Sequence, residues 1–176
     1  GVKERRISDI DVDEMGAISA KNAIKNSSPP DLIINASGVP KQTIPDTSVF
    51  IQKELGFTGI PSFSIHSTCL SFIVAINISA SLLNTDIYKR ILIVSADRGS
   101  RGRNFQEPES SSLLGDAAAA IYIEKNNSMN NGLVSYQMKT YPKGALLTEV
   151  RGGGTNLHPQ DTNVKTSDNL FSMNGP

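Results

Sequence analysis

The order of polar and apolar positions divides the chain into segments with helix-like and strand-like spacing. Over residues 11–26, the apolar side chains of Met15 and Ile18 recur on one helix face, and acidic residues gather at the start, where a helix dipole favours negative charge. A second helix is predicted at residues 46–55, because it begins with residues suited to capping and Gly56 is placed to end it.

A longer apolar segment extends from Cys69 to Leu83. It is too long for one strand, so it predicts a buried helix. Short apolar runs predict buried strands, and a looser alternation predicts one more exposed strand near the middle of the second half; these five segments are residues 31–37, 61–66, 90–96, 117–124 and 133–141. Helices and strands in this order indicate a three-layer α/β unit with a mixed sheet.

Composition narrows the classes of function. The 176 residues carry 17 Lys and Arg against 17 Asp and Glu, so net charge gives no support for nucleic-acid binding. No apolar run approaches the roughly 20 residues of a membrane helix, and we expect no membrane contact. The single cysteine cannot form an internal disulfide, which fits a reducing, cytoplasmic location and leaves a free thiol. The two histidines and the cysteine lack metal-ligand spacing, so no metal site is expected.

Cys69 is the residue with the clearest chemical potential. It follows a tight Ser67-Thr68 connection between the strand that ends at His66 and the long apolar helix. The unpaired amides and partial positive charge of a helix N-terminus favour a thiolate and could help to hold an oxyanion. A nucleophile at a strand–turn–helix junction is typical of a nucleophile elbow. Position alone also allows the opposite interpretation, in which Cys69 is a small buried hydrophobic residue.

Four stretches, taken together in order and spacing, resemble the N-terminal half of β-ketoacyl-acyl-carrier-protein synthase III. The first resembles the family's early GI-R-R segment and the second its segment leading into a helix that ends in Leu-Gly. The third stands at the place of the Ala-Cys-Ala-Gly-Phe active-site turn, and the last resembles a strand, a polar loop and a GDGAGA motif. They are residues 1–7, 44–56, 67–72, and 95–97 with 114–119.

The resemblance implies a fold, an activity and a cellular role. The expected fold is thiolase-like, and residues 1–176 are expected to form one N-terminal domain. This domain would be one three-layer half of the thiolase-like fold, with a mixed sheet of the five-stranded type flanked by helices. The family's first strand and its C-terminal half would be missing. Cys69 takes an acyl group from a coenzyme A or acyl-carrier-protein thioester and condenses it with a malonyl thioester by decarboxylation. The expected enzyme is an acyltransferase of fatty acid or polyketide biosynthesis that needs no cofactor. The assisting His and Asn belong to the C-terminal half, so the chain alone is expected to be inactive.

The resemblance also assigns substrate-binding residues and an oligomeric state. Family members are homodimers, and Ile44, just before Pro45, matches the residue that reaches the partner's acyl pocket. The other matching substrate-binding residues are Leu114, Leu147, Phe171 and Gly175.

The chain departs from the family pattern beside its cysteine and in one loop. Leu70-Ser71 replaces the small Ala-Gly pair, and Glu107-Pro108-Glu109 replaces a loop that often presents an arginine to coenzyme A. These departures leave a different acyl donor or carrier open. Two other functions also remain open: acyl transfer to a hydroxyl or amine without carbon–carbon bond formation, and a non-catalytic half that dimerises with a complete partner.

Other polar features favour structural roles. Asp97 and Asp116 invite a paired-carboxylate interpretation, but Asp116 directly precedes a buried strand and matches an architectural position of the family. His66, at the end of a predicted strand, is expected to be structural. His158 is expected to be an exposed loop residue. The glycine triplet at 152–154 lacks the Lys-Ser/Thr of a phosphate-binding loop and is expected to be a flexible loop.

Overall fold

The computed structural model describes residues 3–126 and 132–174. Its contacts divide the chain into two compact units. The larger unit consists of Ser8–Arg98 and Ala117–Tyr136, and the smaller unit consists of Gly1–Ile7, Gly99–Asp116 and Gln137–Pro176.

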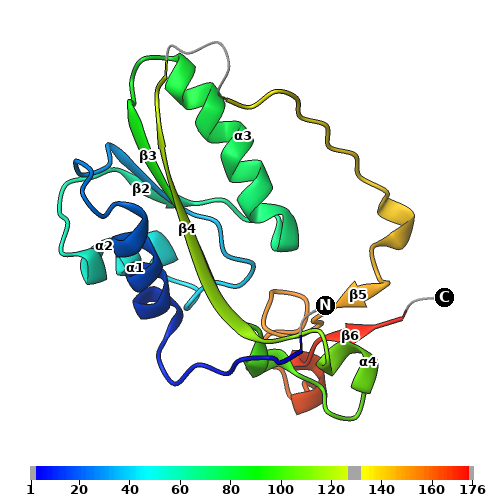
Figure 1. The fold of residues 1–176 in the computed structure, drawn as a ribbon. Helices are drawn as coiled ribbons and strands as arrows, with labels where there is room; N and C mark the ends of the chain where they lie inside the picture. Colours follow the sequence, from blue (N-terminus) through cyan, green and yellow to red (C-terminus); the bar gives the residue numbers. More distant parts are fainter. Residues whose placement is uncertain (1–2, 127–131, 175–176) are drawn as a thin grey trace. The chain divides into compact units, whose positions relative to one another are not determined.

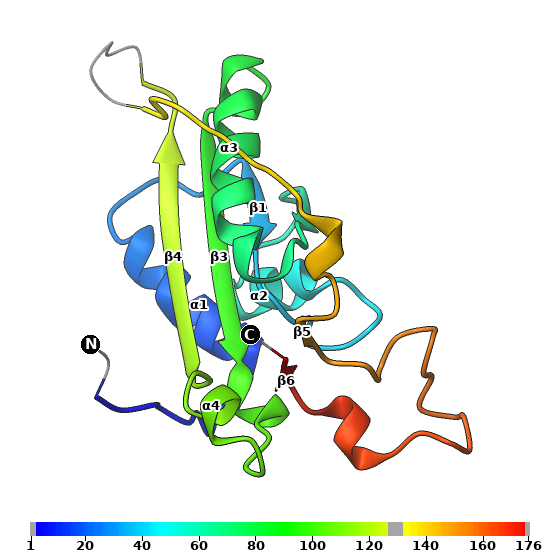
Figure 2. The same ribbon diagram turned by 90° about the vertical axis from the view of Figure 1, so that its right-hand side faces the viewer.

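The larger unit is built on a four-stranded sheet with the strand order β2-β1-β3-β4. β1 (Leu32–Asn35) runs parallel to both β2 (Ser62–Ser64) and β3 (Arg90–Arg98). β4 (Asp116–Glu124) lies beside β3 and runs in the opposite direction (Figure 2). The predicted mixed sheet is therefore confirmed, with four strands.

Helices cover both faces of this sheet (Figure 1). α1 (Val12–Ala23) and α2 (Thr47–Leu55) lie on one face, and α3 (Ser71–Asn84) lies on the other. Successive residues of a strand point to opposite faces, so neighbouring residues of β1 and β3 contribute to different core clusters. One cluster contains Ala20, Ile33, Ile51, Leu92 and Val94; the other contains Leu32, Ile34, Ala36, Ala75, Leu83, Ile91 and Ile93. The predicted three-layer α/β arrangement is confirmed for this unit.

The two ends of α2 form as the sequence predicts. Asp46 accepts a hydrogen bond from the Ser48 amide at 2.9 Å, and Gly56 adopts a φ of +73° at the C-cap, where other residues are strained. In α1, Asp13 is buried instead of facing solvent, and the Lys41 ammonium donates to both of its oxygens at 2.6 Å. This hydrogen bond raises the pKa of Lys41 above its usual value and anchors the loop before α2.

The prediction of a buried helix is only partly correct for α3. Its fully buried residues are mainly small and repeat every four positions, as Ser71, Ala75 and Ser79 do. The side chain of Ile73, on another face of the helix, is 53% exposed. Periodicity detected the helix, but an apolar segment of this length does not show which of its faces will be covered.

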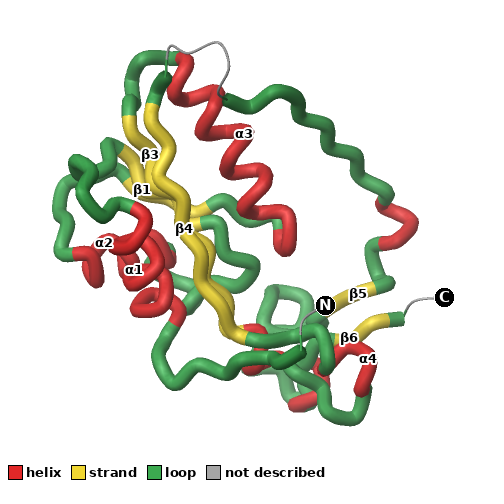
Figure 3. The backbone as a smooth tube through the Cα atoms, viewed as in Figure 1, coloured by secondary structure: helices red, strands yellow, loops and turns green. Residues whose placement is uncertain are grey.

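The strand predicted at residues 133–141 is wrong. Residues 132–141 form no strand or helix (Figure 3), and Val134 is 98% exposed. Alternation can supply a strand with an apolar face, but a strand also needs a neighbouring backbone for its hydrogen bonds. In the described residues, the sheet of the larger unit ends at β4.

The smaller unit contains mostly irregular chain. Its described residues include the single helical turn α4 (Pro108–Ser111) and an antiparallel pair, β5 (Thr148–Glu149) with β6 (Ser172–Met173). They also include short 3-10 helices at Pro142–Gly144 and Thr166–Asn169. The polar loop expected between residues 97 and 114 contains α4 and the 3-10 turn at Gly99–Gly102. Throughout the described residues, no helix has both the length and the apolar character to cross a membrane.

Candidate functional site

Cys69 lies in a tight turn of the larger unit that leads into α3. β2 ends at Ser64, a 3-10 turn spans Thr68–Leu70, and α3 begins at Ser71. Thr68 has a φ of +46°, which is a genuine outlier for a β-branched residue and marks a sharp change of chain direction. The Cys69 thiol is exposed, so the interpretation of Cys69 as a buried hydrophobic residue is wrong. The predicted strand, turn and helix are all present around it.

Ser71 holds this turn through its side chain. Its hydroxyl oxygen accepts a hydrogen bond from the Ser67 amide at 2.9 Å and donates to the Thr68 carbonyl at 2.7 Å. The Leu70 amide closes the same turn by donating to the Ser67 carbonyl at 3.0 Å. Because Ser71 is only 1% exposed, water competes little for these bonds.

Asp97, at the end of β3, holds the loop that follows β1. One carboxylate oxygen accepts hydrogen bonds from the amides of Gly38 at 2.8 Å and Val39 at 3.0 Å, and the second accepts from Gly38 at 3.1 Å. A Cβ atom added to Gly38 would lie 3.3 Å from Asp97 and 3.7 Å from the Thr68 carbonyl oxygen. A side chain at this position would crowd the Asp97 carboxylate, so the glycine allows the loop to lie close to it, beside the Cys69 turn.

Asp116 has a comparable structural role within the smaller unit. Its carboxylate accepts hydrogen bonds from the amide and the hydroxyl of Ser100, each at 2.8 Å. Asp97 and Asp116 therefore both bind backbone groups of nearby loops, in agreement with the architectural role expected for Asp116.

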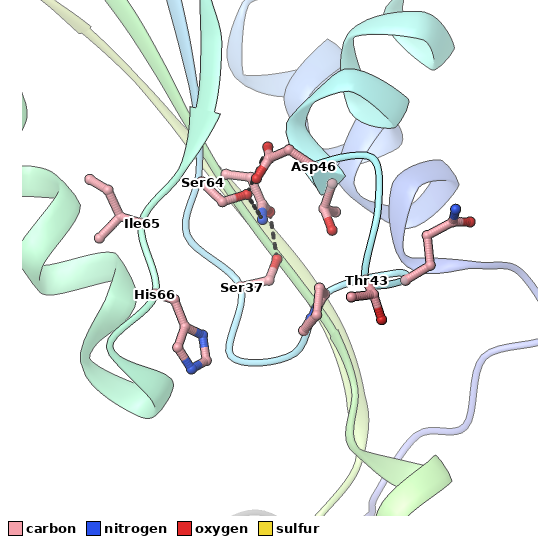
Figure 4. Close-up of a pocket in the computed structure, with 10 residues that line it drawn as sticks. Ser37, Thr43, Asp46, Ser64, Ile65 and His66 are labelled. Atoms are coloured by element: carbon pink, nitrogen blue, oxygen red, sulfur yellow. Dashed lines mark hydrogen bonds between the residues drawn. The ribbon is translucent and has the colours of Figure 1, made fainter. Parts of the chain in front are cut away.

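A hollow of about 350 Å³ opens where β1 and β2 end and α2 begins. Figure 4 shows a chain of hydrogen bonds on its wall: Ser37 donates to Asn35 at 2.6 Å, Asn35 donates to Ser64 at 2.8 Å, and Ser64 donates to Asp46 at 3.0 Å. The other lining residues are Pro40, Gln42, Thr43, Thr47, Ile65 and His66.

His66 is exposed and lines this hollow, beyond the end of β2. Its expected place within a strand is therefore wrong. The strand prediction extended too far because apolar alternation continues through Ile65, whereas the pairing of β2 with β1 stops at Ser64.

The substrate-binding residues implied by the resemblance are divided between the two units. Ile44 belongs to the larger unit, as Cys69 does; it is 79% exposed and precedes Pro45 through a cis peptide bond. The smaller unit contains Leu114 and Phe171, both half-buried, and the exposed Leu147.

Local hydrogen bonds fix the backbone near two of these residues. The Phe171 amide donates to the Gly102 carbonyl at 2.8 Å, and the Leu147 carbonyl accepts from the Asn174 amide at 2.8 Å. Gly175 lies outside the described residues. A substrate-binding role for any of these positions stays a prediction.

Sequence reasoning missed the roles of Ser71 and Gly38. In the sequence, Ser71 was identified only as a departure from a family pattern. A serine near the start of a helix often forms hydrogen bonds with the backbone, which is the signal that could have predicted its role. Gly38 and Asp97 are 59 residues apart, and no local pattern predicts that they meet. Within residues 3–126 and 132–174, no group of three or more His, Cys, Asp and Glu side chains could hold a metal ion.

Comparisons with known proteins agree with this fold. Residues 63–142, which include Cys69, match the family model of 3-oxoacyl-[acyl-carrier-protein] synthase III. The β-ketoacyl-[acyl-carrier-protein] synthase III of Syntrophomonas wolfei is 29% identical over 181 residues, which cover 99% of this chain and 54% of that protein.

Solved structures give the same result. The crystal structure of the Aquifex aeolicus synthase III is 31% identical, with a TM-score of 0.69, over 73% of this chain and 43% of that one. A second 3-oxoacyl-[acyl-carrier-protein] synthase III structure, at 19% identity, supports the fold with a TM-score of 0.85 over 99% of this chain and 57% of that one. The chain is therefore similar over nearly its whole length to β-ketoacyl-[acyl-carrier-protein] synthase III proteins, which are transferases with a thiolase-like fold, and it spans about half the length of the curated relatives it matches.

Proposed function

We propose that Cys69 is the nucleophile of an acyltransferase that draws acyl groups from coenzyme A or acyl-carrier-protein thioesters and condenses them with a malonyl thioester. The observation that carries this proposal is the exposed thiol on a strained turn at the start of α3, within the segment that matches the family model. The names of the matched relatives, which are 3-oxoacyl synthases acting with an acyl carrier protein, support the same chemistry.

The first step is acyl transfer to Cys69. The thiolate attacks the thioester carbonyl, a tetrahedral oxyanion forms, and its collapse expels the donor thiolate and leaves the acyl group on sulfur. Amide groups at the start of a helix can stabilise the oxyanion, because they carry partial positive charge without an intrahelical partner. A thioester product suits this role, since the acyl group stays activated for the second step.

The second step forms the carbon–carbon bond. The malonyl thioester loses CO₂, its α-carbon attacks the acyl group on Cys69, and the cysteine leaves as thiolate, giving a 3-oxoacyl thioester. The His and Asn that the family resemblance assigns to this step belong to the part of the relatives that this chain does not span. We therefore expect the 176 residues alone to lack condensing activity.

A condensation assay with the full-length gene product tests the proposal. The wild-type protein is expected to release CO₂ from malonyl thioester in an amount that matches the 3-oxoacyl product. Cys69→Ser should abolish product formation, because a serine hydroxyl lacks the nucleophilicity of a thiolate. Normal turnover of the serine variant would reject the proposal. Acyl transfer to a hydroxyl or amine acceptor without CO₂ release would favour the non-condensing alternative.

A further inference from the structure

We propose that Ser71 is a positioning residue for Cys69, and that its hydroxyl group locks the turn that presents the thiol. The effect of Ser71 on acyl transfer rests on the proposed function, whereas its two hydrogen bonds are features of the turn itself.

Thr68 requires an external restraint. Its φ of +46° places a β-branched side chain in the left-handed region, which L-residues other than glycine, asparagine and aspartate seldom occupy. Such a conformation persists only where surrounding contacts hold it, and it recurs at functional sites. Relaxation of Thr68 to a negative φ would change the direction of the chain at the residue that directly precedes Cys69.

Ser71 supplies two bonds that enclose this strained residue. Its hydroxyl group accepts the Ser67 amide at 2.9 Å and donates to the Thr68 carbonyl at 2.7 Å. Cys69 lies between the residues joined in this way, so its backbone cannot move freely while both bonds persist. The backward reach to the amide resembles one half of a capping box, in which a side chain inside the helix binds a backbone amide that precedes it.

These two hydrogen bonds require the hydroxyl group of Ser71, and the general family pattern has no such group at this position. The matching position in the Ala-Cys-Ala-Gly-Phe pattern is glycine, which has no hydroxyl group, and here it is Ser71. A glycine can tolerate an unusual backbone conformation, but it cannot bind neighbouring backbone groups through a side chain.

The loop after β1 supports the same turn from another side. Gly38 lies near the Thr68 carbonyl oxygen, which a Cβ added at Gly38 would meet at an ordinary contact distance of 3.7 Å, and the Gly38 amide is bound to Asp97. The Thr68 carbonyl therefore has a hydrogen-bond donor in Ser71, and the loop held by Asp97 lies beside it. Ser71 is the residue whose side chain directly bonds the turn, so its removal gives the sharpest test.

Ser71→Ala removes both bonds while keeping a small, helix-favouring side chain. Ser79→Ala is a matched control, because Ser79 is a buried serine two turns further along α3 whose hydroxyl has no hydrogen-bond partner within the described residues. The first measurement is hydrogen exchange of the Ser67 amide in the 176-residue protein. We expect about tenfold faster exchange in Ser71→Ala, the change for the loss of one net hydrogen bond, and no change in Ser79→Ala.

The second measurement is the rate of Cys69 alkylation by iodoacetamide at one fixed pH. Because the chain contains one cysteine, the total rate reports this thiol alone. In Ser71→Ala, this rate should change by about threefold or more, because Thr68 can relax and the turn no longer holds the thiol in one position. The Ser79→Ala rate should equal that of the wild type.

Several results would overturn the proposal. Unchanged exchange and alkylation in Ser71→Ala, or the same changes in Ser79→Ala, would show that the hydroxyl does not position the turn. Loss of the whole fold in Ser71→Ala would assign the residue a general structural role instead. A wild-type protein that accepts no acyl group would contradict the proposed function only, because exchange and alkylation need no acyl donor.

Discussion

The backbone around Cys69 is held by residues that come from different parts of the sequence. Ser71 binds the turn directly, and Asp97 fixes the loop in which Gly38 lies against that turn. In the sequence, Asp97 and Asp116 suggested a pair of carboxylates for acid–base catalysis. The contacts of Asp97 instead give it the role of an acceptor for backbone amides, which are costly to leave without partners when a loop folds back on the protein.

Asp97→Ala should destabilise the protein by about 2–3 kcal/mol, because hydrogen bonds to a charged acceptor contribute more than neutral ones and two amides lose their partner. Urea unfolding monitored by circular dichroism measures the change. Asp9→Ala, at an exposed position in the larger unit, is the control and should alter stability by no more than about 0.5 kcal/mol. Equal effects of the two substitutions would contradict the role assigned to Asp97.

At the scale of elements, local patterns predicted what local forces determine. The strands β1 and β3 followed from short, nearly continuous apolar runs, and both ends of α2 followed from Asp46 and Gly56. The patterns failed where the outcome depends on a distant neighbour. The segment 133–141 alternates like a strand but pairs with no strand of the described sheet. In α3 the buried positions are mainly small residues, together with Leu83, whereas Ile73 stays exposed.

The parallel strands β1 and β3 are linked at their starts by Asp31 and Arg90. The Arg90 guanidinium donates to the Asp31 carboxylate at 2.6 Å, and the amides of Lys89 and Arg90 donate to the same side chain at 3.0 and 3.1 Å. The hydrogen bond from Arg90, chiefly, lowers the pKa of Asp31 below its usual value.

This pair predicts a pH-dependent contribution to stability. A carboxylate with a lowered folded-state pKa stabilises the protein above the unfolded value of about 3.9, and the contribution is lost as pH falls through the lower folded value. Asp31→Asn should therefore be less stable than the wild type at pH 7, and the difference should shrink progressively below about pH 4. Urea unfolding of both proteins between pH 7 and pH 2.5 measures this, and a difference that stays constant over the range would contradict it.

At the scale of the whole molecule, the chain spans about half the length of its curated relatives, and it leaves large apolar side chains uncovered. Ile44 and Ile73 are both exposed. Exposed apolar side chains that cluster on a protein surface often mark contacts with other protein. For Ile44, the family resemblance predicts that this contact is made with a second copy of the protein.

Ile44→Asp should weaken the proposed homodimer of the full-length gene product by at least about tenfold in dissociation constant, because a charge would be buried in an apolar contact. Sedimentation velocity over a dilution series measures this constant. Ile18→Asp is a suitable control, since Ile18 is also exposed but lies on α1. A wild-type protein that remains monomeric at all concentrations, or equal weakening by both variants, would contradict the assignment of Ile44.

If Cys69 carries the acyl group, as proposed, the peptide that contains it must gain the mass of that group. The full-length gene product is incubated with an acyl-coenzyme A and digested at acidic pH, at which thioesters persist. We predict that the Cys69 peptide gains the mass of the acyl group and loses it on treatment with neutral hydroxylamine, which cleaves thioesters. A protein that forms its product while the Cys69 peptide stays unmodified, and that retains its activity as Cys69→Ser, would contradict the account.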